Sequence, residues 1–218
     1  MEKIKTKDGS YTFYNENFGD IYHSRSGAKE EAMEKFARPA VEFLASEGKK
    51  EANILDICFG LGYNACAAID LAEEVLEVCR LSITGVENDT NILGEVLNMF
   101  PDFENYHLIK KTVQNTPKLI YEKGISIRII EDDALLVISS LNGRYDVVFH
   151  DPFSPKSCPD LWSEYFFRKI ANVMVEGGRL FTYSCARSVR ENLKKAGFDI
   201  RDGPKVGRRA PSTVAIRL

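Results

Sequence analysis

Short apolar runs alternate with amphipathic stretches along most of this chain, and the alternation predicts strands that alternate with helices. The apolar residues of 54–57 predict a buried strand, and two glycines then lead into a helical pattern over 64–78. Further strands are predicted at 82–86, 126–130, 146–149 and 178–183. Strands that alternate with helices form a mainly parallel sheet with helices packed on both faces.

Helical patterns fill the intervals between these strands, at 90–100, over most of 104–123, and at 161–175 and 188–196. The tail adds two apolar segments joined by the short loop 205–211, which predicts an antiparallel hairpin. The expected fold is therefore α/β and Rossmann-like, with a mostly parallel seven-stranded sheet that ends in an antiparallel hairpin. This arrangement is typical of S-adenosyl-L-methionine (SAM)-dependent methyltransferases.

Residues 1–50 are interpreted as an N-terminal extension. An Asp-Gly dipeptide between two short alternating segments is typical of a β-hairpin. Apolar side chains at helical spacing predict an amphipathic helix over 28–45, and Pro39 predicts a kink in it or its division into two shorter helices. We expect this extension to pack on a single methyltransferase domain formed by residues 51–218, beside its cofactor pocket.

Composition limits the partners and the cellular location that we expect for such a fold. The chain has 218 residues, 44% apolar content and a net charge of −3, so any nucleic acid must meet a local basic patch. No apolar run approaches the length of a membrane helix and the start is no signal peptide, so we expect a soluble, cytoplasmic protein without an obligate protein partner. The five cysteines include no closely spaced pair, which favours reduced thiols over disulfides or a zinc site.

The turn after the first core strand carries a nucleotide-binding pattern. Residues 56–62 read D-x-C-x-G-x-G, close to the D/E-x-G-x-G-x-G turn of SAM-dependent enzymes, with Cys58 in place of the first glycine. Glu87 ends the second strand, where an acid can accept hydrogen bonds from both ribose hydroxyls of a nucleoside. The alternative is a helix-capping turn followed by a solvated glutamate.

Ligands of open α/β sheets bind at the carboxyl ends of the strands, and four successive strands deliver an acid to this edge. Such a rim suits a cationic sulfonium with a ribose better than a dinucleotide, and Asp133 is placed to accept the exocyclic amine of adenine. The residues predicted to bind SAM are Asp56, Cys58, Gly60, Gly62, Asn64, Glu87, Asn88, Asp133, Ala134 and Asp151. We expect neither a metal nor FAD.

The fourth strand ends in Asp151, Pro152 and Phe153, close to the (D/N)-P-P-(Y/F) turn of enzymes that methylate amino groups. A carboxylate at this tip can hold an amine nucleophile and accept its proton. The proline stiffens the turn, and the aromatic ring packs beside the reacting methyl or the target base. The alternative is that Asp151 caps the following loop and that Phe153 belongs to the core.

Several segments together resemble the MnmC-type tRNA methyltransferases, which complete 5-methylaminomethyl-(2-thio)uridine at the tRNA wobble position. The strongest likeness is to their D-x-F-x-P-x-x-x-P-x-x-W segment, at 145–167. The others are an F-x-D-x-Y segment, the glycine turn, and a T-Y-S strand with an L-x-x-A-G-F helix and a basic tail, at 17–36, 54–64 and 177–216.

The resemblance implies that Asp151 orients the amine, that Phe153 lies at the reactive methyl, and that the anticodon loop of tRNA is the partner. The sequence departs from the family at Cys58 and at Pro152, where the family has glycines. Many family members also carry a FAD-dependent oxidase domain, which we do not find in this chain. The resemblance therefore implies methylation of 5-aminomethyluridine that another route supplies.

The remaining candidates concern the substrate. The residues predicted to contact it are Tyr22, Pro152, Tyr183, Lys205, Arg208 and Arg209. His23 lies beside Tyr22, and either side chain could line the pocket, whereas the basic loop could equally be a solvated turn. His150 should point away from Asp151 because side chains alternate along a strand, and Trp162 should pack the loop after Asp151.

Three rival functions remain open at this point. An aminopropyltransferase of the spermidine-synthase type shares the core and also brings an amine to a sulfonium. A methyltransferase of the same fold could act on a small-molecule amine or on a protein. A non-catalytic nucleotide-binding module would lack an acid directed at an amine, and Asp151 argues against it.

Overall fold

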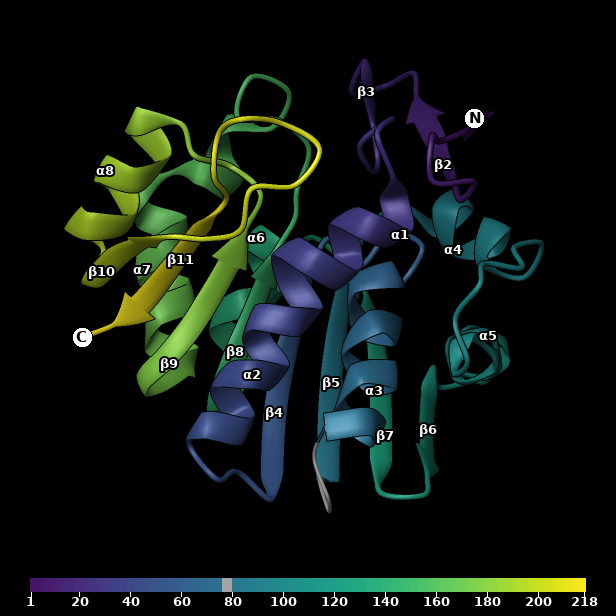
Figure 1. The fold of residues 1–218 in the computed structure, drawn as a ribbon, viewed down its shortest axis with the longest axis horizontal. Coiled ribbons are helices and arrows are strands. Elements are labelled where there is room, and N and C mark those ends of the chain that lie inside the picture. Colours follow the sequence, from purple (N-terminus) through teal and green to yellow (C-terminus); the bar gives the residue numbers. More distant parts are fainter. Residues whose placement is uncertain (76–79) are drawn as a thin grey trace.

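Eight strands form the central sheet of the computed structural model, which describes residues 1–75 and 80–218 (Figure 1). β11 runs antiparallel to both of its neighbours and β6 runs antiparallel to β7, while the other neighbouring strands are parallel. The expected Rossmann-like fold is confirmed. The strand order is β10 (Phe198–Asp202), β11 (Thr213–Arg217), β9 (Met174–Thr182), β8 (Tyr145–His150), β4 (Glu51–Ile57), β5 (Arg80–Glu87), β7 (Ile125–Glu131) and β6 (Leu119–Glu122).

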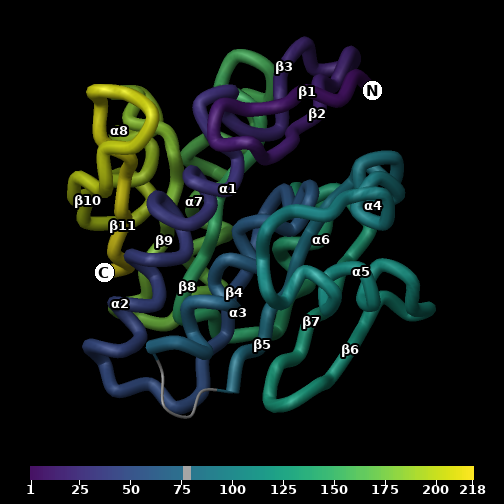
Figure 2. The backbone as a smooth tube through the Cα atoms, turned by 45° about the vertical axis from the view of Figure 1, so that its right-hand side comes forward, coloured from purple at the N-terminus to yellow at the C-terminus, as the bar shows by residue number. Residues whose placement is uncertain are grey.

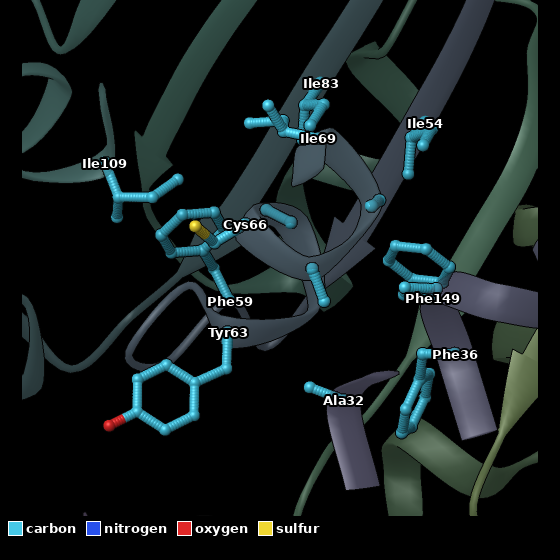
Figure 3. Close-up of a cluster of buried hydrophobic side chains, with 14 of the residues drawn as sticks. Ala32, Phe36, Ile54, Phe59, Tyr63, Cys66, Ile69, Ile83, Ile109 and Phe149 are labelled. Carbon is cyan, nitrogen blue, oxygen red and sulfur yellow. The ribbon is translucent and has the colours of Figure 1, made fainter. Parts of the chain in front are cut away.

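The side chains of β4 show why helices cover both faces of the sheet. Ile54 belongs to one buried cluster, part of which is drawn in Figure 3, whereas Leu55 and Ile57 belong to another. Successive side chains of a strand point to opposite faces, so an uninterrupted apolar run needs cover on both. The helices packed in the first cluster are α1 (Ala28–Glu31), α2 (Arg38–Ser46), α3 (Tyr63–Val75), α4 (Thr90–Val96) and α5 (Tyr106–Gln114). Those in the second are α6 (Ala134–Val137), α7 (Glu164–Val173) and α8 (Arg187–Lys195).

A three-stranded antiparallel sheet precedes this core. β1 (Glu2–Lys5) and β2 (Tyr11–Asn15) form the predicted hairpin, and β3 (Asp20–Ile21) pairs with β2 as a third strand beyond that hairpin. Figure 1 shows this sheet at the end of the molecule to which the arrow of β9 points, and it lies at the same end of the backbone trace in Figure 2. The N-terminal residues therefore lie above the edge that was expected to bind ligands.

The helix between this sheet and β4 is continuous but irregular. A π-helical segment, η1 (Ala32–Ala37), joins α1 to α2, and Pro39 lies in the first turn of α2. Proline donates no backbone hydrogen bond, so it is tolerated where the helical hydrogen-bond pattern changes. The predicted break near Pro39 is thus a change of helical pitch within one helix.

The number of strands in the main sheet was predicted wrongly, because the described residues contain eight rather than seven. The additional strand is β6, within the segment 104–123 that was expected to be mostly helical. The helix of that segment, α5, ends at Gln114, and Pro117 follows before β6 begins. In β6 the buried Ile120 stands between two exposed residues, which is the period of an edge strand.

Several boundaries also differ from the predicted ones. The helix predicted over 64–78 is confirmed as far as Val75, and its last three positions lie outside the described residues, as does Cys79. The helix predicted over 161–175 is divided into a 3₁₀ turn, η3 (Pro159–Trp162), and α7, because Ser163 caps a new helix through Phe166 N–H. The other four cysteines are free thiols.

Gly85 of β5 gives a direct test of how the turn after β4 is held. A Cβ atom at this position would lie 2.4 Å from Cδ2 of Phe59, whose ring packs beneath the turn. We expect Gly85→Ala to lower the free energy of unfolding by about 1–3 kcal/mol, since the ring must move. The free energy of unfolding is measured by urea denaturation, with circular dichroism as the signal for the folded fraction.

Gly94→Ala is the matched control, because that helical position faces open space. Alanine there should raise the free energy of unfolding by about 0.5–1 kcal/mol. Equal unfolding midpoints for the two variants would contradict this account of the packing.

Candidate active site

Two neighbouring cavities open at the carboxyl ends of the parallel strands, and they share one wall. The shared wall is made by Tyr22, His23, Asp151, Pro152 and Phe153. The first cavity is completed by Phe18, Cys58, Gly60, Val86, Glu87, Asn88, Asp89, Asp132, Asp133, Ala134, Cys158 and Leu161. The second cavity, of about 240 Å³, is completed by Asp20, Ile21, Ser24, Glu31, Lys35, Ser154, Tyr183, Val206, Gly207 and Arg208.

Glu87 lies at the end of β5, with its side chain buried in the wall of the first cavity. Its Oε2 accepts a hydrogen bond from Gly60 N–H at 2.8 Å, and its Oε1 accepts one from Asp89 N–H at 2.9 Å. Burial raises the pKa of Glu87 to about 7, against the opposing effect of these backbone donors. Each carboxylate oxygen can accept a second hydrogen bond, so Glu87 can still receive two hydroxyl groups.

The residues predicted at the ends of β5 and β7 reach the same cavity, since Asn88, Asp133 and Ala134 all line it. Asp133 caps α6, and its Oδ1 accepts a hydrogen bond from Leu135 N–H at 2.8 Å. This cap leaves Oδ2 of Asp133 without a hydrogen bond from the described residues. One oxygen thus fixes the side chain while the other remains for a ligand.

The residues of the glycine turn divide into two groups. Cys58 and Gly60 line the first cavity. Cys58 adopts φ 64°, a backbone conformation in which a side chain is strained, and its thiol stands where the motif has glycine. The other predicted turn residues are buried behind the turn and do not line the first cavity: Asp56, Gly62 and Asn64.

These buried turn residues have other roles in the fold. A Cβ on Gly62 would lie 2.8 Å from both Phe59 and Ile109, and its φ of 72° favours glycine, so this position serves the packing of the turn. Asn64 Nδ2 donates a hydrogen bond to Oδ2 of Asp151 at 2.9 Å. Asp56 is completely buried, which raises the pKa of its carboxyl well above the ordinary value.

Asp151 follows the last residue of β8 and stands between the two cavities. Its side chain is only 6% exposed, and burial raises the pKa of its carboxyl well above the ordinary value, helped by the Glu31 carboxylate nearby. Oδ2 accepts the hydrogen bond from Asn64 and lies 3.9 Å from Nδ1 of His23. Among the described residues no donor reaches Oδ1, so this oxygen is available to a molecule in either cavity.

The loop after Asp151 is held from several directions. Trp162 Nε1 donates a hydrogen bond to the carbonyl of Phe153 at 2.8 Å, as expected for a tryptophan that packs this loop. The Phe153 ring contacts Phe18 and Tyr22, with ring centroids 4.9 and 4.8 Å apart. Three aromatic rings from two distant segments thus gather beside Asp151, and such faces attract a cation.

The second cavity has a charged floor. Lys35 Nζ lies 2.6 Å from Oε1 of Glu31, and both side chains are less than a tenth exposed. Glu31 also accepts a hydrogen bond from Ser24 N–H, and Asp20 accepts one from Ser154 N–H. The cavity therefore carries one buried carboxylate, Glu31, and one partly exposed carboxylate, Asp20, each of which is hydrogen-bonded to the protein.

The predicted substrate residues are only partly brought together. Tyr183 lines the second cavity, and its hydroxyl donates to the carbonyl of Pro152 at 3.1 Å. Arg208 also lines this cavity, and its Nη2 donates to the carbonyl of Tyr183. Lys205 and Arg209 belong to the same loop but are exposed and do not line the cavity.

The two buried histidines behave differently. His150 is completely buried against Trp162 and Phe167 on the far side of the strand, and burial lowers its pKa to about 3. The prediction that it points away from Asp151 is confirmed. His23 lies in the shared wall, and its ring stacks on Tyr63 with centroids 5.2 Å apart.

Sequence reasoning missed several residues of these walls. Asp89 accepts hydrogen bonds from Tyr22 and Asn15, so it ties the N-terminal sheet to the core beside the first cavity. Phe18 stood inside a segment with a family resemblance and could have been found from it. The Glu31–Lys35 pair gave no comparable signal, because charges spaced by four residues usually form an exposed helix face.

Residues 1–75 and 80–218 lack two features that would change the interpretation of the site. No group of three or more His, Cys, Asp or Glu side chains there is arranged to hold a metal ion. Nor does that part of the chain contain a helix of the length and apolar character needed to cross a membrane.

Comparison with known proteins gives consistent matches. Residues 102–217 match a family described as S-adenosyl-L-methionine-dependent methyltransferases. The structure superposes on MnmC2 from Aquifex aeolicus with a TM-score of 0.84 and 33% identity, over 98% of this chain and 69% of that one. The sequence is 31% identical to an uncharacterised protein of Methanocaldococcus jannaschii, over 98% of this chain.

A third relative carries a functional name. The chain is 28% identical, over 94% of its length, to the tRNA 5-methylaminomethyl-2-thiouridine biosynthesis bifunctional protein MnmC of Ralstonia nicotianae. The chain spans 59% of the length of the archaeal relative and 33% of the length of this bifunctional protein. The similarity is therefore to one part of a longer protein.

The raised pKa of Glu87 predicts how SAM binding depends on pH. Hydroxyl donors favour the ionised carboxylate, so affinity for SAM should rise as the pH increases through about 7, where Glu87 ionises in the folded protein. Glu87→Gln should weaken SAM binding by about tenfold to a hundredfold at pH 8, the effect of losing hydrogen bonds to a charged group. Calorimetric titration between pH 5.5 and 8 measures both effects.

Glu176→Gln, at an exposed position of β9, is the control and should leave the affinity and its pH dependence unchanged. If Glu87→Gln bound SAM as tightly as the unmodified protein, the assignment of Glu87 to the ribose would be wrong.

Proposed function

The chain belongs to the family of SAM-dependent methyltransferases that includes the methyltransferase part of MnmC, and we propose that it methylates the amino group of 5-aminomethyl(-2-thio)uridine at the wobble position of tRNA. The observation that carries this proposal is the position of Asp151, a buried acid between two cavities. The likeness to MnmC2 and to a tRNA 5-methylaminomethyl-2-thiouridine biosynthesis protein supports the choice of acceptor.

The walls of the first cavity suit SAM. Glu87 has free acceptor sites for ribose hydroxyls, and Asp133 has an oxygen for the adenine amine. The rings of Phe18, Tyr22 and Phe153 suit a sulfonium cation. When bound, SAM supplies a methyl group activated by a positively charged sulfur.

The second cavity is assigned to the amine and its uracil ring. A primary aliphatic amine is mainly an ammonium ion near neutral pH and has no lone pair for attack. Asp151 can hold this ammonium through Oδ1 and accept its proton, and the raised pKa of its carboxyl makes it a better proton acceptor than an exposed aspartate. Phe153 lines both cavities beside Asp151, so its ring would limit the directions from which the amine can reach the methyl donor.

The tRNA is expected to approach over the loop of residues 205–209, where Lys205 and Arg209 are exposed next to the second cavity. Phosphates of the anticodon loop would meet these cations. We propose that the protein acts in the cytoplasm, where its tRNA substrate would be found. The independence from FAD expected from the sequence stays a prediction.

The rival acceptors place different demands on the second cavity. A polyamine needs free carboxylates along its length, whereas Glu31 is paired with Lys35 and Arg208 adds a cation to the wall. This favours a nucleotide over the polyamine of an aminopropyltransferase. A methyltransferase that acts on a small amine remains the second candidate, because Asp151 would serve it equally.

The proposed function is tested by methyl transfer from labelled SAM to tRNA that carries 5-aminomethyluridine, with unmodified tRNA and putrescine in parallel. Label should enter only the aminomethyl tRNA. Asp151→Asn should lower kcat by about 10²–10⁴-fold, the contribution of a positioned base, while SAM binding is retained. If SAM binds but putrescine is labelled instead of tRNA, the wobble-uridine assignment is wrong.

The basic loop makes a separate prediction about salt. Replacing Lys205 and Arg209 together by glutamine should raise KM for tRNA and reduce the slope of log affinity against log salt by about 2, one for each phosphate contact. Lys110→Gln is the control, because α5 lies near the β6 edge of the sheet and this loop joins β10 and β11 at the other edge (Figure 1). It should change neither KM for tRNA nor the salt slope. An unchanged salt slope in the double variant would mean that the loop does not contact tRNA.

A further inference from the structure

His23 and His150 are both buried histidines, but only His23 lies beside the Asp151 carboxyl group. Its side chain is 5% exposed, and in the part of the chain that the structure describes neither ring nitrogen has a hydrogen-bond partner. A buried polar group without a partner destabilises a fold. The ring stacks on Tyr63 with an interplanar angle of 5°, a contact that phenylalanine would make without buried nitrogens.

One ring nitrogen of His23 lies close to the carboxyl group of Asp151. Nδ1 of His23 lies 3.9 Å from Oδ2 of Asp151, so a small rotation of either side chain brings them to hydrogen-bond distance. His23 also lines both cavities, and the wall of the second cavity includes the partly exposed Ser24 and the exposed Arg208. The imidazole is thus placed beside the buried acid and in a cavity whose wall includes exposed side chains.

We propose that His23 acts through Asp151, by accepting the proton that Asp151 takes from the substrate ammonium and passing it to solvent through the second cavity. The inference rests on the proposed amine methylation. The ammonium N–H bond breaks and its proton moves to Asp151. The neutral amine then forms the N–C bond, and the electron pair of the broken C–S bond stays on sulfur. The proton on Asp151 moves to Nδ1 of His23, so that the acid is ready for the next amine.

The charges around His23 suit this role. The groups that face it are Asp151 at the end of β8, Tyr63 of α3, Glu31 of α1, Lys35 of η1 and Asp8 of the turn after β1. Burial lowers the pKa of His23, so the resting imidazole is neutral and can accept a proton, while the Glu31 and Asp8 carboxylates oppose that lowering. The Glu31 and Asp8 carboxylates therefore favour the protonated form that the relay requires.

The test is the pH profile of methyl transfer by His23→Phe, which keeps the ring stack on Tyr63. At pH 7 we expect kcat to fall about a hundredfold, the lower end of what a positioned base contributes. The defect should shrink as the pH approaches about 10, where an aliphatic amine loses its proton without help. SAM affinity, measured in parallel, should stay within a factor of two, about 0.4 kcal/mol, of the unmodified value.

Two further variants distinguish a loss of proton transfer from a loss of side-chain packing. His23→Asn retains a group that can hydrogen-bond to Asp151 but cannot carry a proton at neutral pH, so it should show the same pH-dependent loss. His150→Phe makes the matched change at a buried histidine that faces away from Asp151, and it should keep the unmodified pH profile when rates are normalised to SAM-binding protein.

Failure of the proposed role of His23 can be distinguished from failure of the proposed amine methylation. If the unmodified protein labels no aminomethyl tRNA, the proposed function fails. If it does label this tRNA and His23→Phe loses no activity at pH 7, or loses the same fraction at every pH, the role of His23 in proton transfer is wrong. A pH-dependent loss in both His23 variants, absent in His150→Phe, supports it.

Discussion

The site depends on the burial of one carboxyl group, that of Asp151. A carboxylate withdrawn from water is unstable unless donors or a cation compensate it, and in the described residues one hydrogen bond from Asn64 and the nearby Lys35 ammonium do so only in part. The remaining demand is met when a cation binds, which makes the empty acid selective for an ammonium ion. Asp151 lies between the two cavities that we propose for SAM and for the amine, and in that proposal it would also align the two reactants.

The fold could be read from the sequence to a large extent, because its dominant signals are local. The apolar run at 54–57, the glycine turn and the Asp151 segment each predict a strand end, and parallel strands bring such ends to one edge. β6 was missed because it has only four residues and one buried side chain. So short a pattern could not be distinguished from the helical pattern of the residues before it. The irregular π-helical segment before α2 was foreseen only as a break near Pro39.

The site could be predicted mainly where the strand ends define it, and the resemblance of residues 17–36 added Tyr22, which lines both cavities. Glu87, Asp133 and Asp151 stand at such ends and reach the cavities, whereas Asn64 and Gly62 lie in the expected turn but face inward, because side-chain direction there depends on how the turn packs on Phe59. Glu31, Lys35 and His23 come from the N-terminal segment, far from β8 in the sequence. The place of Glu31 and Lys35 beside Asp151 is a consequence of tertiary packing that no local pattern encodes, whereas His23 was a candidate only through its neighbour Tyr22.

The most direct test of the central claim is to locate the transferred methyl group. The protein is incubated with SAM that carries a deuterated methyl group and with tRNA that contains 5-aminomethyluridine, and the digested nucleosides are analysed by mass spectrometry. The account predicts deuterium on the exocyclic nitrogen of the wobble nucleoside, as 5-methylaminomethyluridine or its 2-thio form. Deuterium on a ring atom, a ribose or another position of the tRNA would contradict the assignment of the second cavity to the amine.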